Sequence, residues 1–279
     1  MQTTSSTLKL PKNIWHITLV VFAITLAIFI PTYHWQPFPE PLNDNILSSI
    51  YIFAALITAI YGTLLVRQFS PGELPRKVWL TFVLGWWCAV LAEILWVIYR
   101  SLMSEFPPFT FIDVAWLSAY FWLGLSIYYQ HHLISGKQKL PYSYLLVLNL
   151  ILIVSAALTT LAQKAGLGEG MSWLVLFLAV LYPVSDIFLG IYALRISLIF
   201  GRGMLGRPWW GLITFTIADS LSVYFWMGGD KFMAKQIAQY FYLFSDTSYL
   251  TGYLLTALGL LSILVLSQKS SAEPAPSLS

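Results

Sequence analysis

Long apolar runs separated by short polar segments fill this chain almost from end to end. Eight runs follow one another, at residues 14–31, 46–66, 78–99, 110–129, 142–162, 173–200, 209–227 and 240–266. Each can supply the ~20 helical residues that cross a hydrocarbon core of ~30 Å. The pattern therefore predicts an all-α integral membrane protein with eight transmembrane helices.

The composition agrees with a chain that is surrounded by lipid. Hydrophobic residues make up 58% and charged residues 10% of the 279 residues, whereas a soluble domain carries about 25% charged residues. The net charge of +3 comes without a basic cluster that would follow a phosphate backbone, so no nucleic-acid partner is expected. The lipid bilayer is the predicted partner.

Motifs of catalysis and cofactor binding are missing from the sequence. The single cysteine, Cys88, rules out an intrachain disulfide framework and a thiolate metal cluster. No lysine lies inside a predicted span to form a retinal Schiff base, and there is no HExxH, GxSxG or glycine-rich phosphate motif. We therefore expect no cofactor, no metal and no catalytic residue of a recognisable type.

The basic residues predict the orientation in the membrane. Eleven lie on one side or at helix ends there, namely Lys9, Lys12, Arg67, Arg76, Lys77, Lys137, Lys139, Arg195, Arg202, Arg207 and Lys269. Four lie on the other side, namely Arg100, Lys164, Lys231 and Lys235. The positive-inside rule then places both termini in the cytoplasm and the protein in the cell membrane. Residues 1–13 form a cytoplasmic segment, and the Pro/Ser-rich residues 268–279 are expected to be a disordered cytoplasmic tail.

A motif that occurs twice predicts a duplication. FIDVAWLSAY (residues 111–120) aligns with FSDTSYLTGY (residues 244–253), each with an acid, an aromatic residue three positions later and a tyrosine seven positions later. Residues 59–69 likewise align with 190–200, and Ala92-Glu93 with Ala218-Asp219. Four helices per half give both halves the same topology. We therefore predict two parallel four-helix repeats, 14–139 and 140–267, related by an axis along the membrane normal.

Five carboxylates inside the predicted helices are the candidate site, because an acid near a helix centre costs ~2.5–3.5 kcal/mol on insertion. They are Glu93, Asp113, Asp186, Asp219 and Asp246. The predicted topology places them toward the extracytoplasmic half. Six aromatic residues on the same or neighbouring helix faces complete the candidate site: Trp96, Trp116, Tyr182, Trp226, Tyr249 and Tyr253. Carboxylates backed by aromatic rings predict an outward-facing pocket for a small cationic or polar ligand.

Structural roles compete with this interpretation. Asp113 and Asp246 are expected to open their helices, where an acid caps free N–H groups. Glu93 can pair with Arg100, two turns along the same helix. Asp186 and Asp219 have no basic neighbour on their own helices, which leaves a hydrogen bond between helices as the structural alternative. Asp186 aligns with an alanine in the first half and follows a proline by one turn, so this unduplicated acid is the sharper functional candidate.

The sixth predicted span, AVLYPVSDIFLGIYALRI, resembles the Tyr-Pro, Asp and Leu-Arg helix of the multi-spanning input regions at the N-terminus of bacterial diguanylate cyclases and related signalling proteins. IADSLSVYF and FSDTSYLTGYLLTALGL resemble the remainder of that module, while LAEILWVIY and FPPFTFIDVAWLSAYFWLGL resemble its first-half copy. The resemblance covers residues 51–266 and implies a sensory membrane domain. Those proteins continue into a cytoplasmic catalytic domain, whereas this sequence ends at Ser279, so a separate cytoplasmic signalling partner is expected.

The favoured hypothesis is a stand-alone sensory or ligand-binding membrane protein that signals to this partner. A small-molecule or proton-coupled transporter is the first alternative, because parallel repeats, a proline-containing helix and buried acids also suit a carrier. A membrane enzyme acting on a lipid-like substrate comes next, and a scaffold without a ligand also remains open.

Overall fold

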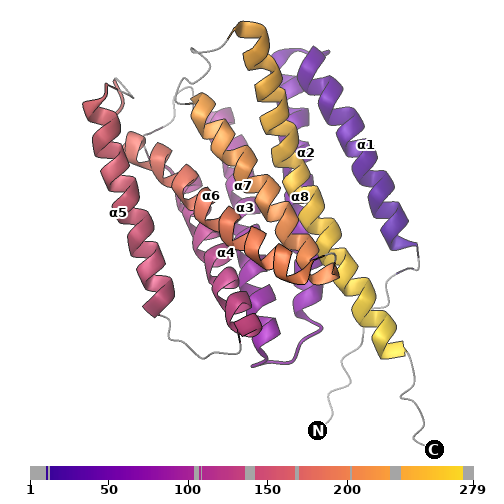
Figure 1. Cartoon of the computed structure of the whole chain (residues 1–279). Helices are drawn as coiled ribbons and strands as arrows, with labels where there is room; N and C mark the ends of the chain where they lie inside the picture. The colour runs from indigo at the N-terminus through magenta and orange to yellow at the C-terminus, as the bar shows by residue number, and fades with distance from the viewer. Residues whose placement is uncertain are drawn as a thin grey trace, which may run out of the picture.

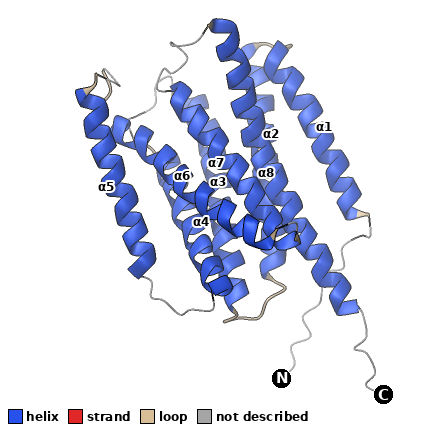
Figure 2. Ribbon diagram, viewed as in Figure 1, coloured by secondary structure: helices blue, strands red, loops and turns tan. Residues whose placement is uncertain are grey.

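The computed structural model describes residues 11, 13–103, 107, 109–135, 142–166, 170–201, 203–226 and 234–272. These residues form helices and connecting loops, and no strand occurs among them (Figure 2). In chain order the helices are α1 (Ile14–Trp35), α2 (Glu40–Val66), α3 (Leu74–Leu102), α4 (Phe111–Ser135), α5 (Tyr142–Lys164), α6 (Trp173–Phe200), the 3-10 helix η1 (Met204–Gly206), α7 (Arg207–Trp226) and α8 (Lys235–Ala272).

Seven of these helices have the length and apolar composition needed to cross a membrane, so the protein is an all-helical, multi-pass membrane protein. The helix outside this group is α7, which has 20 residues. Its sequence is more polar because it carries Asp219 and several serines and threonines. It packs between α6 and α8, where a polar side chain can find a protein partner instead of lipid. The eighth span stays a prediction.

The helices form one bundle with α5 and α1 at opposite edges, and α1 begins at the end of the bundle where α8 finishes (Figure 1). Among the described helices, α7 packs most extensively on α8, and α3 packs almost as extensively on α4. The pairs α6–α7 and α2–α3 come next, and α2 also packs on α8. The core between them is aromatic, with Trp86, Trp209, Phe82 and Tyr253 fully buried.

Small residues allow the closest helix pairs to touch. A Cβ atom added at Gly252 of α8 would lie 2.9 Å from the backbone nitrogen of Phe215 in α7. One added at Gly85 of α3 would lie 3.3 Å from the carbonyl oxygen of Ala119 in α4. Helix association in membranes depends on such close approach, because lipid provides no hydrophobic driving force between helices.

Both ends of the last helix differ from the prediction, and the difference at its start affects the candidate site. The last helix begins at Lys235, five residues before the predicted position, because its polar first turn contains good helix formers. Asp246 therefore lies inside α8, and the expectation that it opens the helix is wrong. The same helix runs to Ala272, into the segment expected to be a tail, and residues 273–279 lie outside the described residues. In contrast, α4 begins close to the predicted residue.

Candidate functional site

The predicted acids lie in a group of carboxylates and tyrosines that crosses the bundle, which we call the carboxylate–tyrosine layer. It consists of Glu93, Asp113, Asp186, Asp219 and Asp246 together with Tyr33, Tyr51, Tyr120, Tyr182, Tyr249 and Tyr253. Seven helices contribute to it, namely α1, α2, α3, α4, α6, α7 and α8. The contribution of α7 is Asp219. The layer therefore joins both halves of the chain.

Tyr120 joins two acids at the centre of the layer. Its hydroxyl lies 2.8 Å from Oδ1 of Asp186 and 2.8 Å from Oδ2 of Asp219. The two carboxyl groups lie within electrostatic range of each other, and the hydroxyl of Ser220 donates to the second oxygen of Asp186 at 3.2 Å. Asp186 is almost completely buried, with 1% of its surface exposed.

These contacts require a proton on one of the two acids. A tyrosine hydroxyl has one hydrogen to donate, and an ionised carboxylate only accepts hydrogen bonds. Tyr120 therefore satisfies one of its two carboxyl neighbours as a donor, and its contact with the other needs a hydrogen on that carboxyl group. The arrangement of Asp186, Tyr120 and Asp219 is chemically complete when one carboxyl carries a proton.

Glu93 occupies a second buried position, from which two tyrosines approach the same oxygen. The hydroxyls of Tyr253 and Tyr249 donate to its Oε1 at 2.9 Å and 3.1 Å. Asp219 lies within electrostatic range of Glu93, which connects this cluster to the Tyr120 cluster. The pairing of Glu93 with Arg100 is not observed, because Arg100 forms an ion pair with Asp44 in the first turns of α2.

Asp113 and Asp246 lie at the two ends of the layer. Tyr182 donates to Oδ1 of Asp113 at 2.9 Å, and its ring packs against that of Tyr120, with 5.8 Å between the centroids. Tyr33 lies within electrostatic range of the Asp246 carboxylate. Tyr51 donates to the backbone carbonyl of Asp246 at 3.3 Å.

The capping role expected for Asp113 is present beside its contact with Tyr182. The backbone N–H and the hydroxyl of Thr110 donate to Oδ2 of Asp113 at 2.8 Å and 2.9 Å, while Thr110 accepts from the N–H of Ile112 at 3.1 Å. This reciprocal arrangement is a capping box at the start of α4. Asp113 therefore has a structural task that Asp186 and Asp219 lack.

No base balances the layer among the described residues. The ion pair found among the described residues joins Arg100 and Asp44, outside the layer. Hydroxyl groups and the Thr110 N–H donate to the acids of the layer. Acids within a membrane usually pair with each other or with a base, or face a water-filled path. Among the described residues the layer therefore combines buried acids with hydroxyl donors and has no base to balance the acids.

The three remaining predicted site residues are tryptophans, and each has different surroundings. Trp116 lies beside the layer, with its ring centroid 6.4 Å from that of Tyr249 and 6.1 Å from that of Phe215. Trp96 lies on an outer face of α3, with 45% of its surface exposed. Trp226 ends α7, and its side chain lies outside the described residues.

Three layer residues were missing from the predicted site: Tyr33, Tyr51 and Tyr120. Tyr120 was visible as the last residue of the duplicated motif. Tyr51 had a signal too, because it precedes Tyr182 by the same 131 positions that separate Ala59 from Gly190. Tyr33 lies in the first span, which matches the fifth span only in being apolar, so no pattern in the sequence indicates it.

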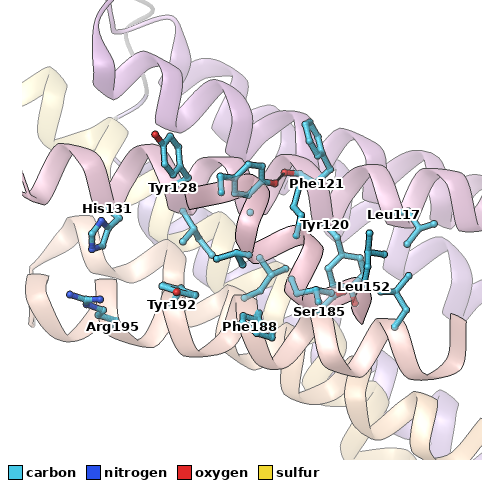
Figure 3. A pocket seen from close by; sticks show the side chains of 18 of the residues that line it. Leu117, Tyr120, Phe121, Tyr128, His131, Leu152, Ser185, Phe188, Tyr192 and Arg195 are labelled. Carbon is cyan, nitrogen blue, oxygen red and sulfur yellow. Dashed lines mark hydrogen bonds between the residues drawn. The ribbon is translucent and has the colours of Figure 1, made fainter. Parts of the chain in front are cut away.

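A cavity of about 800 Å³ lies between α4, α5 and α6 (Figure 3). His131 and Arg195 lie at one end, and Leu117 and Leu152 lie toward the other. Tyr120 belongs both to the cavity wall and to the carboxylate–tyrosine layer. Among the described residues, none of the five acids lines this cavity. It is therefore separate from the predicted outward-facing pocket, which stays a prediction.

The described residues contain no group of three or more His, Cys, Asp or Glu side chains that could hold a metal ion. No family model, curated protein or solved structure matches this chain.

Proposed function

We propose that this protein is a membrane sensor in which proton or cation occupancy of the carboxylate–tyrosine layer sets how its two halves pack. The observation that carries the proposal is the single hydroxyl of Tyr120 between Asp186 and Asp219, at 2.8 Å from each. This contact needs one exchangeable positive charge. Loss of that charge leaves two buried carboxylates side by side, and their repulsion favours a different helix arrangement.

Paired contacts support the proposed duplication on which this switch depends. Tyr120 of the first half approaches Asp219 of the second, and the aligned Tyr253 of the second half approaches Glu93 of the first. Tyr182 and the aligned Tyr51 make a second such pair, with Asp113 and with the Asp246 backbone. The extensive contact of α3 with α4 also corresponds to that of α7 with α8. Movement of one half against the other would change both sets of contacts together.

The proposed external ligand is a small cation or a polar molecule from the extracytoplasmic side. Five acids with no paired base among the described residues would attract such a ligand, and the rings of Trp116, Tyr249 and Tyr253 supply faces for a cation–π contact. The resemblance to the input regions of diguanylate cyclases fits this proposal, because Tyr182 and Asp186 of the resembling helix both belong to the layer. The response would be read by a partner at the proposed cytoplasmic loops.

The test is a pH titration of the purified protein in lipid nanodiscs. Infrared difference spectra report protonated carboxyl groups, and tryptophan fluorescence reports helix movement. We expect the wild type to show a pH-dependent step in both signals, and Asp186→Asn and Asp219→Asn to abolish it while the proteins remain folded. Asp44→Asn, which removes an acid paired with Arg100 outside the layer, is the matched control and should keep the step. The proposal fails if both layer variants titrate as the wild type does.

A transporter is the second candidate, and one observation favours it specifically. The cavity reaches Tyr120 from the side of His131 and Arg195, which the positive-inside rule assigns to the cytoplasm. The acids lie toward the opposite side on the same topology, so Tyr120 is positioned between two approaches. Proteoliposomes loaded with a pH-sensitive dye separate the two functions, because a carrier moves protons under an imposed gradient in an Asp186-dependent way and a sensor does not.

A further inference from the structure

The cavity between α4, α5 and α6 occurs where the two halves pack differently. In the first half, α1 packs on both α2 and α8. In the proposed duplication α5 corresponds to α1, and α4 corresponds to α8. The counterpart of the α1–α8 contact would be a contact of α5 with α4, but α5 packs mainly on α6. It meets α4 through Tyr144, whose hydroxyl donates to the carbonyl oxygen of Phe121 at 2.6 Å. The space that a helix contact fills in one half remains as a cavity in the other.

The lining is apolar along its length and basic at one end. Leucine, isoleucine and aromatic side chains make up most of the wall, among them Leu117, Ile127, Ile151, Leu152, Leu181 and Phe188. The basic end of the cavity is formed by His131, His132 and Arg195. Arg195 lies within electrostatic range of His131, and Figure 3 shows the two side chains on adjacent helices at this end of the cavity.

This distribution selects for a particular kind of molecule. A volume of about 800 Å³ falls within the ~300–1,000 Å³ typical of small-molecule sites. The apolar length suits one hydrocarbon chain. The planar guanidinium of Arg195 presents two parallel N–H groups that match the two oxygens of a carboxylate, and the adjacent imidazoles add further donors.

We infer that the cavity binds a long-chain fatty acid, with its carboxylate at His131, His132 and Arg195 and its chain running between α4, α5 and α6 toward Leu117. This site differs from the acidic pocket proposed above in charge, in ligand class and in the side of the membrane from which it fills. Its existence does not depend on the protonation of the layer. Tyr120 lines the cavity, so a chain that reaches it contacts the residue that joins Asp186 and Asp219.

The experiment uses a long-chain fatty acid carrying a diazirine in its chain, added to the whole protein in nanodiscs of zwitterionic lipid. After illumination, mass spectrometry of peptides locates the attachment sites. We expect them on the cavity faces of α4, α5 and α6, and we expect excess oleate to suppress labelling about tenfold or more while methyl oleate does not, because the ester lacks the charge that Arg195 recognises.

Two variants test the head and the chain separately. Arg195→Gln should reduce labelling about tenfold, whereas Lys164→Gln, which removes a charge from the far end of α5, should leave it unchanged. Val147→Trp should fill the cavity and abolish labelling, whereas Leu146→Trp should not, because Leu146 is 69% exposed and does not line the cavity. Thermal unfolding of each variant checks that it is folded, and Arg195→Gln alone decides the question if Val147→Trp does not fold.

Either of two results overturns the inference. Equal competition by oleate and methyl oleate would show that the cavity takes a neutral chain and that the basic end plays no part. Labelling spread over all lipid-facing helices, and unchanged in Val147→Trp and Arg195→Gln, would show that the probe reports only bulk lipid. Neither result bears on the pH titration of Asp186 and Asp219, so failure of this inference and failure of the proposed function are distinguishable.

Discussion

Replacement of Tyr120 by phenylalanine tests the centre of the layer with the smallest possible change. The substitution removes one oxygen that lies 2.8 Å from carboxyl groups on two other helices, and it keeps the ring that packs against Tyr182. Two buried carboxyl oxygens then lose their contact with the hydroxyl. The loss of stability therefore reports the hydrogen bonds rather than the packing.

The magnitude follows from these two contacts. Hydrogen bonds between membrane helices average about 0.6 kcal/mol and reach about 1.7 kcal/mol, whereas bonds to charged groups in proteins reach about 1.5–3 kcal/mol. For a hydroxyl shared by Asp186 and Asp219, we expect Tyr120→Phe to lower the free energy of unfolding by about 1–3 kcal/mol. The assay is reversible unfolding in mixed micelles of increasing dodecyl sulfate content, followed by circular dichroism.

Tyr61→Phe is the matched control. The hydroxyl of Tyr61 lies 2.9 Å from that of Thr18 on the neighbouring helix. The substitution therefore removes one neutral contact and should lower the free energy of unfolding by about 0.6 kcal/mol. A double-mutant cycle adds a second check, because Tyr120→Phe should cost at least about 0.5 kcal/mol less in the Asp186→Asn background. The reasoning is refuted if Tyr120→Phe costs no more than Tyr61→Phe, or if its cost is the same in both backgrounds.

Two further predictions concern packing and capping. Gly252→Ala should destabilise the protein by about 1–3 kcal/mol, because the added Cβ would meet the backbone of Phe215. The same unfolding assay should show a smaller loss for Gly190→Ala, where the nearest atom is the hydroxyl oxygen of Thr216. Equal losses would contradict the close contact of α7 and α8. Thr110→Val should lower the stability by about 0.5–2 kcal/mol in thermal unfolding through loss of the capping box. The control is Thr160→Val, whose hydroxyl bonds to the Ala156 carbonyl of its own helix, and its stability should stay within about 0.5 kcal/mol of the wild type. A Thr110 variant as stable as the wild type would leave Asp113 without a capping role.

The sequence predicted the helices well where hydrophobicity changes sharply. The span predicted at 173–200 is the helix Trp173–Phe200 in the structure, because a serine cap precedes it and a glycine follows it. The last helix was predicted too short, since Lys235 to Gln239 are polar and yet form helix. An apolar run marks the lipid-facing length of a helix, whereas propensity and packing decide where the helix begins.

The acids of the layer were visible in the sequence, but most of their partners were not. Spacing along one helix tells which residues share a face, and it suggested Arg100 for Glu93. The partners observed are Tyr249 and Tyr253, more than 150 positions away, because the position of α8 relative to α3 in the bundle decides the contact. The cavity was beyond prediction for a similar reason, since it arises from the position of α5 relative to α4 and leaves no periodic signal.

The exchange of tyrosines between halves has a consequence for the origin of the chain. Under the proposed duplication, an ancestor with one four-helix copy would have made these contacts twice between two identical subunits around a twofold axis, as isologous interfaces do. Any acid in such a dimer is present twice or not at all. Asp186 aligns with Ala55, so it belongs to one copy alone. Under the proposed duplication, fusion of the two copies would allow a single, off-axis carboxyl pair.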